Sequence, residues 1–292
     1  MNPTFSTRPT FLGVENARRD ASFVVAGVPF DIGTTNRAGT RFGPAAIRSA
    51  SRMLCDGTNP YHWRTPTDLD LADIGDFQIL LGDIQESLRL IEAQASAIPG
   101  HLVALGGDHT IALPLLRALS KRTGPLGLVH FDAHVDTWPS NFGQVWAHGS
   151  MFFHAINEGI VDPRRMIQIA IRSPVQRDVW DWTVGQGVTI LTAEECHRIG
   201  VDAIAARIRE VVGIGPTYLS FDVDGIDPSQ TPGTGTPEVG GIFTWQAQAI
   251  LRRLGGIDWR GMDVVEVSPP YDVAEITSLA AATMAFEYLS LL

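Results

Sequence analysis

Three short polar segments of the chain carry side chains that can bind divalent metal ions. They are Gly106-Gly107-Asp108-His109, Asp132-Ala133-His134-Val135-Asp136 and Asp222-Val223-Asp224-Gly225-Ile226-Asp227-Pro228. Each follows an apolar, strand-like run, and the carboxyl ends of strands are where an α/β protein builds its site. The two histidines and four of the aspartates exceed the needs of one open catalytic metal, and they suit two adjacent ions with bridging carboxylates and a shared water. We therefore expect a binuclear metallohydrolase with these candidate ligands: His109, Asp132, His134, Asp136, Asp222 and Asp224.

Each motif also has a simpler structural interpretation. Asp108 or His109 could cap the helix that follows the first glycine-rich turn. In an extended stretch, Asp132, His134 and Asp136 would lie on one side, and burying three such groups is costly unless they bind something. Two acids as close as those of the third motif raise each other's pKa unless a cation neutralises them. Asp227, next to Pro228, is better suited to fixing a turn than to binding metal.

Composition and charge exclude several classes of function. The 292 residues include 22 Lys and Arg against 32 Asp and Glu, a net charge of −10, so a broad nucleic-acid surface is not expected. A small cationic substrate fits this balance better. The two cysteines, Cys55 and Cys196, stand far apart, which excludes a disulfide framework and a cysteine-based zinc site. The polar residues 1–19 lack a signal-peptide core, and no apolar stretch reaches the length of a membrane helix. We expect a soluble, cytoplasmic protein with no membrane partner.

Strand-like and helix-like segments alternate along almost the whole chain. Continuous apolar runs predict buried strands, and 3.6-residue periodicity predicts the helices between them. This alternation predicts a parallel sheet covered on both faces, a three-layer α/β/α sandwich with a mainly parallel central sheet. No linker or repeat divides the chain, so residues 1–292 are expected to form a single domain. The predicted strands are 23–28, 102–105, 126–131, 166–171, 188–191, 218–221 and 261–267, and the predicted helices are 45–54, 83–97, 110–119, 150–157, 202–212, 244–254 and 276–291.

The three motifs together resemble the signature set of the ureohydrolases, the family of arginases and agmatinases. The resemblance covers nearly the whole chain, from Gly27-Val28-Pro29-Phe30-Asp31 to the strand that carries Glu266. That strand and the segment Pro232-Gly233-Thr234-Gly235-Thr236-Pro237 are closer to agmatinase-type members than to arginases. The resemblance implies an arginase-like fold and a homo-oligomer, a trimer or hexamer.

The resemblance also implies a role for each candidate site residue. His109, Asp132, Asp136 and Asp222 would surround one Mn²⁺ ion, and Asp132, His134, Asp222 and Asp224 the other, so Asp132 and Asp222 would bridge. His148 matches the family's proton shuttle, and Glu266 matches the carboxylate that holds the guanidinium group. Asp136, His148 and Glu266 are the candidate catalytic residues. Ni²⁺, Co²⁺ or Zn²⁺ could occupy a similar set of ligands.

The chemistry of the reaction supports those roles. A guanidinium carbon is a poor electrophile because its charge is delocalised, and a water shared by two metal ions supplies the strong nucleophile that is needed. A carboxylate can orient the planar cation through paired hydrogen bonds. The tetrahedral intermediate collapses once the leaving amine is protonated, which suits a mobile histidine. Without the resemblance, His148 could equally be a solvated loop residue, and Glu266 a member of a structural ion pair.

The substrate tail is expected to meet the loop 137–147, where Trp138, Asn141 and Trp146 are the candidate contacts. This loop has no positive residue for an α-carboxylate, so free arginine is disfavoured. Aromatic faces favour a cationic or apolar tail, which ranks agmatine first. Gly225 is shared with guanidinobutyrase-like members, so 4-guanidinobutyrate ranks second, with Arg37 or Arg41 meeting its carboxylate, and other small alkylguanidines rank third. Together with Arg172, these two arginines could instead hold the loops near the mouth or form solvated pairs.

Two hypotheses from other classes remain beside this one. A non-catalytic guanidine-binding or regulatory homologue could keep the fold, but all six expected ligands are present here. A zinc deacetylase on a related fold would use fewer ligands around one metal. His130 lies two residues before Asp132, on the same side of the predicted strand, but the family pattern assigns it no role.

Overall fold

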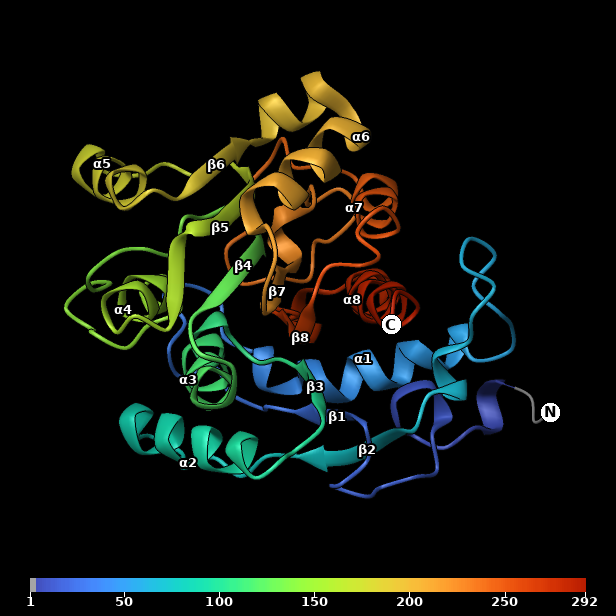
Figure 1. Ribbon diagram of the computed structural model, residues 1–292. Helices are drawn as coiled ribbons and strands as arrows, with labels where there is room; N and C mark the ends of the chain where they lie inside the picture. The colour runs from blue at the N-terminus through green and yellow to red at the C-terminus, as the bar shows by residue number, and fades with distance from the viewer. Residues whose placement is uncertain (1–3) are drawn as a thin grey trace.

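The computed structural model describes residues 4–292; residues 1–3, which belong to the predicted domain and its polar amino-terminal segment, lie outside the described part. Its centre is a single sheet with strand order β2-β1-β3-β8-β7-β4-β5-β6, and every neighbouring pair is parallel (Figure 1). The strands are β1 (Phe23–Gly27), β2 (Leu71–Asp76), β3 (His101–Leu105), β4 (Leu126–Phe131), β5 (Val161–Ile171), β6 (Thr189–Thr192), β7 (Thr217–Asp222) and β8 (Trp259–Val265).

Helices cover both faces of this sheet, which confirms the predicted three-layer α/β/α architecture (Figure 1). One face carries α1 (Gly43–Ser51), α6 (Ala193–Val212), α7 (Thr244–Leu251) and α8 (Ile276–Leu289). The other carries α2 (Ile84–Ser96), α3 (Ala112–Thr123), α4 (Met151–Asn157) and α5 (Arg177–Gln186). Short 3₁₀ helices join several of these elements. Among the described residues, the structure contains no helix both long and apolar enough to span a bilayer.

Strand β4 shows why the interior strands are continuous apolar runs. Leu126 and Leu128 pack toward α3 and α4, whereas Val129 and Phe131 pack toward the opposite helices, and all four side chains are fully buried. Because successive side chains of a strand point to opposite faces, a sheet covered on both sides needs apolar residues at nearly every position. His130 is the polar exception in this strand.

The structure contains elements that were not expected from the sequence. Strand β2 lies at the edge of the sheet, and the exposure of its second half hides the apolar pattern. Helix α5 buries little more than Val179 and Thr183, so its periodicity is weak. Helix α6 runs from Ala193 to Val212, but non-helical Gly200 (φ 79°) divides it into two parts; the predicted helix 202–212 lies in the second part, and the first part was not expected. Other boundaries move by a few residues, as helix ends commonly do.

The four central strands β3, β8, β7 and β4 are consecutive neighbours in the sheet. Since they are parallel, their carboxyl ends meet at one edge. The first two metal-competent motifs directly follow β3 and β4, the third begins at Asp222, the last residue of β7, and Glu266 follows β8. The topology therefore gathers four segments that are far apart in the sequence at a single place.

Candidate metal centre and active site

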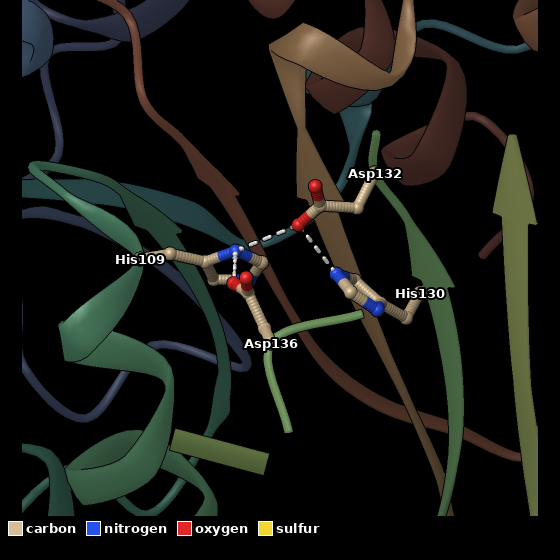
Figure 2. A group of neighbouring side chains, drawn as sticks. All are labelled: His109, His130, Asp132 and Asp136. Atoms are coloured by element: carbon tan, nitrogen blue, oxygen red, sulfur yellow. Dashed lines mark hydrogen bonds and ion pairs between the residues drawn. The ribbon is translucent and has the colours of Figure 1, made fainter. Parts of the chain in front are cut away.

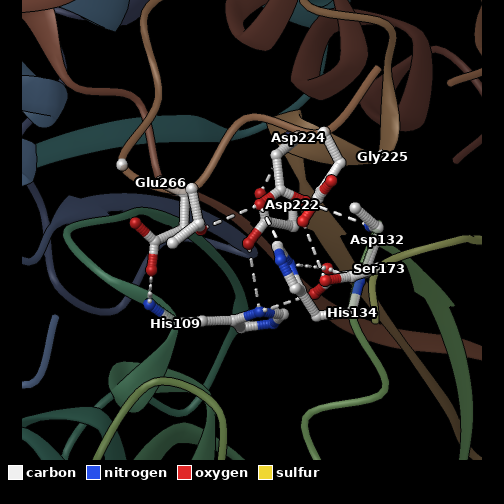
Figure 3. A network of polar contacts seen from close by, with 12 residues as sticks. His109, Asp132, His134, Ser173, Asp222, Asp224, Gly225 and Glu266 are labelled. Atoms are coloured by element: carbon white, nitrogen blue, oxygen red, sulfur yellow. Dashed lines mark hydrogen bonds and ion pairs between the residues drawn. The ribbon is translucent and has the colours of Figure 1, made fainter. Parts of the chain in front are cut away.

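His109 lies at the centre of the first half of the cluster. Its Nδ1 atom is 3.1 Å from Asp132 Oδ2, 3.0 Å from Asp136 Oδ2 and 3.3 Å from Asp222 Oδ2 (Figures 2 and 3). All four side chains are buried. Within residues 4–292 this nitrogen has no hydrogen-bond partner. One imidazole lone pair facing three carboxylate oxygens is a suitable arrangement of ligands for a metal ion.

His134 forms the second half of the cluster. Its Nδ1 atom is 3.1 Å from Asp132 Oδ1 and 3.2 Å from Asp224 Oδ2 (Figure 3). The two oxygens of Asp132 thus face different histidines, as a bridging carboxylate would require. Asp222 Oδ1 accepts a hydrogen bond from the Asp224 N–H, which holds these two acids in one turn. The structure therefore brings together all six candidate ligands.

Glycine makes two close backbone approaches around the cluster possible. A Cβ on Gly107 would lie 2.1 Å from the carbonyl oxygen of Phe30, so only glycine fits where the chain leaves β3. A Cβ on Gly225 would lie 2.9 Å from the backbone nitrogen of Asp132. Asp108, as one interpretation of the sequence held, caps the next turn by accepting from the Thr110 N–H.

The segment from Asp132 to Asp136 is not extended, which differs from the prediction. Strand β4 ends at Phe131, and Asp136 has a φ of 49°, a value rare outside glycine, asparagine and aspartate. The side chains of Asp132, His134 and Asp136 converge because the chain turns back. Strand alternation is not the cause. The close approach is held in part by the Ala133 N–H, which donates to Asp224 Oδ1.

The electrostatics of the cluster show a deficit of positive charge. Burial and the nearby charges of Asp224 and Asp132 raise the pKa of Asp222 well above its usual range. Burial lowers the pKa of His109, but Asp132, Asp136 and Asp222 outweigh it and raise that pKa well above the usual value. A divalent cation at each histidine would relieve both effects. The imidazole and carboxylate donors, without a thiolate, fit ions such as Mn²⁺, Co²⁺, Ni²⁺ or Zn²⁺.

Glu266 and His148 lie directly beside this cluster. Glu266 Oε1 accepts a hydrogen bond from the His109 N–H and lies 2.9 Å from His148 Nδ1. The other oxygen, Oε2, is buried and without a hydrogen-bond partner in the described part of the chain. Glu266 has a φ of 66°, a strained value that directs it from the end of β8 into the site. A buried carboxylate oxygen without a partner is costly unless a ligand supplies the donor.

His148 connects Glu266 to the loop that follows β1. Its Nε2 atom is 2.7 Å from Thr35 Oγ1. Burial lowers the pKa of His148, but Glu266, Asp136 and Asp108 together outweigh burial and raise that pKa to about 9. In the absence of bound cations His148 therefore holds a proton at neutral pH.

The arginines near the mouth have separate partners. Arg41 pairs with the buried carboxylate of Asp31, and its Nε atom lies 2.6 Å from Asp31 Oδ1. Arg37 lies over the ring of Tyr271, with its guanidinium carbon 4.8 Å from the ring centroid. Arg172 donates to backbone carbonyls, among them Asp224 and Glu238. Arg41 and Arg172 thus hold loops.

The predicted tail-binding residues are not gathered at the cluster. The Trp138 indole N–H donates to Gln176, and this side chain packs against Val179 and its neighbours. Trp146 lies against His154 and over Arg117. Asn141 lies next to Gly149, and its Oδ1 is buried and unpaired within residues 4–292. Of the three, Asn141 is therefore the one that retains a free polar atom near His148.

Sequence reasoning assigned no role to two polar residues that the structure places beside the cluster. His130 Nε2 is 2.7 Å from Asp132 Oδ2 (Figure 2), and Gln168 lies beside His130 on the neighbouring strand. A signal for both was available. Each is a polar residue inside an apolar run, 126–131 for His130 and 166–171 for Gln168, and buried polar groups require partners.

Comparison with known proteins gives matches over nearly the whole chain. Residues 21–290 match the arginase family. The guanidinobutyrase of Pseudomonas aeruginosa is 47% identical, covering 94% of this chain and 86% of that protein. The agmatinase of Photorhabdus laumondii is 45% identical, covering 93% and 87%. The solved structure of proclavaminate amidino hydrolase from Streptomyces clavuligerus aligns with a TM-score of 0.94 at 38% identity, covering 99% of this chain and 98% of that chain.

Proposed function

This chain belongs to the arginase family, and from that premise we propose that it hydrolyses agmatine to putrescine and urea. Its relatives are amidinohydrolases, which act on C–N bonds of linear amidines. The observation that carries the proposal is the unpaired, buried Oε2 atom of Glu266 next to the cluster of His109 and the aspartates. That oxygen offers a planar cation an acceptor at the place where two metal ions would be held.

Six side chains would hold the two ions. His109, Asp132, Asp136 and Asp222 would ligate one of them, and Asp132, His134, Asp222 and Asp224 the other. Two bound divalent ions would lower the pKa of a water shared between them toward neutrality and so provide the nucleophile. We assign Mn²⁺ as the native ion, with Ni²⁺ or Co²⁺ as the alternatives, because the donor set contains imidazole and carboxylate only.

Glu266 and His148 would divide the remaining work between them. Glu266 would accept hydrogen bonds from N–H groups of the guanidinium. These bonds would orient the guanidinium carbon toward the aspartates. Water adds to that carbon, and the bond between it and the tail nitrogen then breaks. The leaving amine needs a proton, and His148, which lies 2.9 Å from Glu266, would supply it. Asp136, which lies 3.0 Å from His109 and whose charge acts on His148, would complete the catalytic set.

Agmatine is favoured over an amino acid because two of the three arginines near the mouth are engaged. Arg41 is neutralised by Asp31, and Arg172 is bound to carbonyl groups. The net charge of −10 also favours a dicationic substrate. Trp138, Asn141 and Trp146 remain the proposed contacts of the tail, and Asn141 is the one with an unpaired buried atom.

A second candidate substrate is 4-guanidinobutyrate. Arg37 makes no ion pair within the described residues, and it belongs to the same loop as Thr35, which contacts His148. It could therefore meet the carboxylate of an ω-guanidino acid. A guanidinobutyrase is 47% identical to this chain, which supports this second candidate.

The proposal extends to the protein's surroundings. We assign it to the cytoplasm, as a homo-oligomer of three or six chains, with a small guanidino substrate and with neither nucleic acid nor membrane as a partner. The acidic net charge of −10 supports the absence of a nucleic-acid partner. The relatives named above support the guanidino substrate.

A urea-release assay on Mn²⁺-loaded protein separates the candidate substrates. The panel holds agmatine, 4-guanidinobutyrate, arginine, guanidine and dimethylguanidine. Preferred turnover of agmatine is expected, and Arg37→Met should leave it unchanged. The second candidate replaces the first if 4-guanidinobutyrate is the preferred substrate and Arg37→Met raises the KM for it. The control Arg177→Met, on the exposed face of α5, should leave that KM unchanged. If no compound releases urea while both sites are filled, the proposal fails.

A further inference from the structure

Two polar residues lie next to each other inside the sheet, in the strands that lead to the metal cluster. His130 on β4 and Gln168 on β5 are register partners, and both side chains are fully buried. His130 also packs against Phe152, with ring centroids 4.5 Å apart. Neither residue has a part in the reaction as described above. Buried polar side chains at such positions need a specific set of hydrogen bonds.

The hydrogen bonds of Gln168 determine which nitrogen of His130 carries the proton. Gln168 Nε2 is 2.6 Å from the carbonyl oxygen of Val135 and 3.1 Å from His130 Nδ1. Because a carbonyl only accepts, the amide atom facing Val135 must be the NH₂ group. Its second hydrogen is then available to His130 Nδ1, which must accept. A neutral imidazole with Nδ1 as acceptor carries its hydrogen on Nε2.

That hydrogen is directed at Asp132. His130 Nε2 is 2.7 Å from Asp132 Oδ2, and the same oxygen faces His109 Nδ1 at 3.1 Å (Figure 2). The other oxygen, Oδ1, accepts from the His134 N–H at 2.6 Å. Each oxygen of the carboxylate is therefore held by its own donor, and each faces a different half of the cluster.

His130 could instead be a metal ligand, since its donor atom and those of His109, Asp132 and Asp136 all lie within 4.8 Å of one another. A ligand needs a free lone pair on the nitrogen that faces the metal. The bond from Gln168 occupies the Nδ1 lone pair and leaves a hydrogen on Nε2, so His130 would have no lone pair to offer on the side of the cluster. Its geometry suits a donor better than a ligand.

We propose that His130 is a positioning residue for the bridging carboxylate of Asp132, with Gln168 fixing its protonated nitrogen. The inference rests on the proposed metal centre and adds the device that orients its shared ligand. Partners of this kind hold a ligand in the geometry the metal requires, and their loss weakens metal binding by about 10–100-fold. Because a bridging carboxylate would bind both ions, the affinity for metal should fall at both sites.

Metal affinity tests the proposal independently of turnover. Mn²⁺ affinity is measured by competition with a chelator, and the unfolding temperature is recorded for stripped and loaded protein. His130→Phe keeps the ring and its contact with Phe152 but removes the donor, and we expect about 10–100-fold weaker binding. His130→Gln returns an N–H group near the same place and should recover most of the affinity. Gln168→Met keeps His130 but removes the hydrogen bond to its Nδ1 atom. This variant should therefore also bind Mn²⁺ more weakly.

The control is His154→Phe, a half-buried histidine of α4 that lies outside the cluster, and this variant should bind Mn²⁺ as the unaltered protein does. Unchanged affinity in both His130→Phe and Gln168→Met would overturn the proposal. Equal loss of unfolding temperature with and without metal, at unchanged affinity, would show a packing role only. Failure of His130→Gln to recover binding would also count against it. If the unaltered protein binds no divalent ion, the proposed function itself fails.

Discussion

Glu266 and His148 are joined by a 2.9 Å contact between Oε1 and Nδ1, yet they are suited to different tasks. Glu266 has one oxygen engaged with His109 and His148 and one oxygen free, as a group that holds a cation should. In the absence of bound cations His148 holds a proton, because Glu266, with Asp136 and Asp108, outweighs the effect of burial and raises its pKa to about 9. Neither side chain is within the set of six ligands. Binding of the guanidinium, transfer of the proton and binding of metal are thus assigned to separable residues.

Replacing His148 should therefore lower turnover without loss of metal. For His148→Ala we expect kcat to fall by about 10²–10⁴-fold, because the leaving amine loses its proton donor, while KM changes little. Metal per chain is measured by elemental analysis on the same sample that is assayed for urea. His154→Ala, a histidine on α4 outside the cluster, is the matched control. Loss of metal in His148→Ala would instead make this residue a ligand or a structural element.

At the scale of elements, the site depends on loops that are fixed by a half-buried cation. Arg172, immediately after β5, donates to the carbonyl oxygens of Asp224 and Glu238 at 2.7 and 2.6 Å, and also to those of Ala170 and Gly225. These carbonyls belong to the end of β5, the turn that carries Asp224, and the loop that follows the proline-rich segment. Burial lowers the pKa of Arg172, and the surrounding acids oppose that effect. One side chain thus ties three segments together.

We expect Arg172→Lys to destabilise the protein, since an ammonium group cannot reach the same set of carbonyls. Leaving buried acceptors unpaired costs about 1–3 kcal/mol each, and partial rearrangement should bring the loss to roughly 2–4 kcal/mol in the free energy of unfolding. Denaturant unfolding of metal-free protein measures it. Arg177→Lys, whose pair with Asp181 is exposed, should change stability by less than about 0.5 kcal/mol. Equal stability of the two variants would contradict the account of Arg172.

The elements that could be predicted from the sequence are those whose own residues carry the signal. The interior strand of residues 126–131 was predicted at its observed bounds because burial on both faces makes it continuously apolar. Strand β2 and helix α5 were missed because each is half exposed. The six metal-competent residues could be identified from their order after three strands. The partners of His130 and Arg41 could not, because they depend on register and loop contacts between distant segments.

At the scale of the whole molecule, the two ends of the sheet have different electrostatic character. The carboxyl ends of the strands hold the buried acids, and the amino end of β3 holds His101, which lies 2.8 Å from the hydroxyl oxygen of Tyr288. Burial lowers the pKa of His101 to about 4, and the charges of Arg260 and Arg122 contribute. Bound cations would stabilise the buried acids at the carboxyl edge, whereas protonation of His101 at the opposite edge is unfavourable.

His101 should make stability fall as the pH is lowered. The folded protein keeps this group neutral to about pH 4, whereas the unfolded chain protonates it near 6.5. Its contribution is therefore fully present above pH 6.5 and is lost as the pH falls toward 4, by at most about 3 kcal/mol. His101→Gln, which has no titratable group, should show a smaller decrease in unfolding free energy between pH 7 and pH 4.5 than the unaltered protein. Parallel pH profiles for the two proteins would contradict this.

The most direct test of the central claim is a titration of metal-stripped protein with Mn²⁺, in which bound metal and urea release from agmatine are measured on the same samples. Two histidines and four aspartates shared between two sites predict that activity rises as binding approaches two ions per chain. Asp132→Ala, which removes the carboxylate that faces both histidines, should lose metal and activity together. Full activity in the stripped protein, or no urea with two ions bound on any guanidine of the panel, would contradict the account.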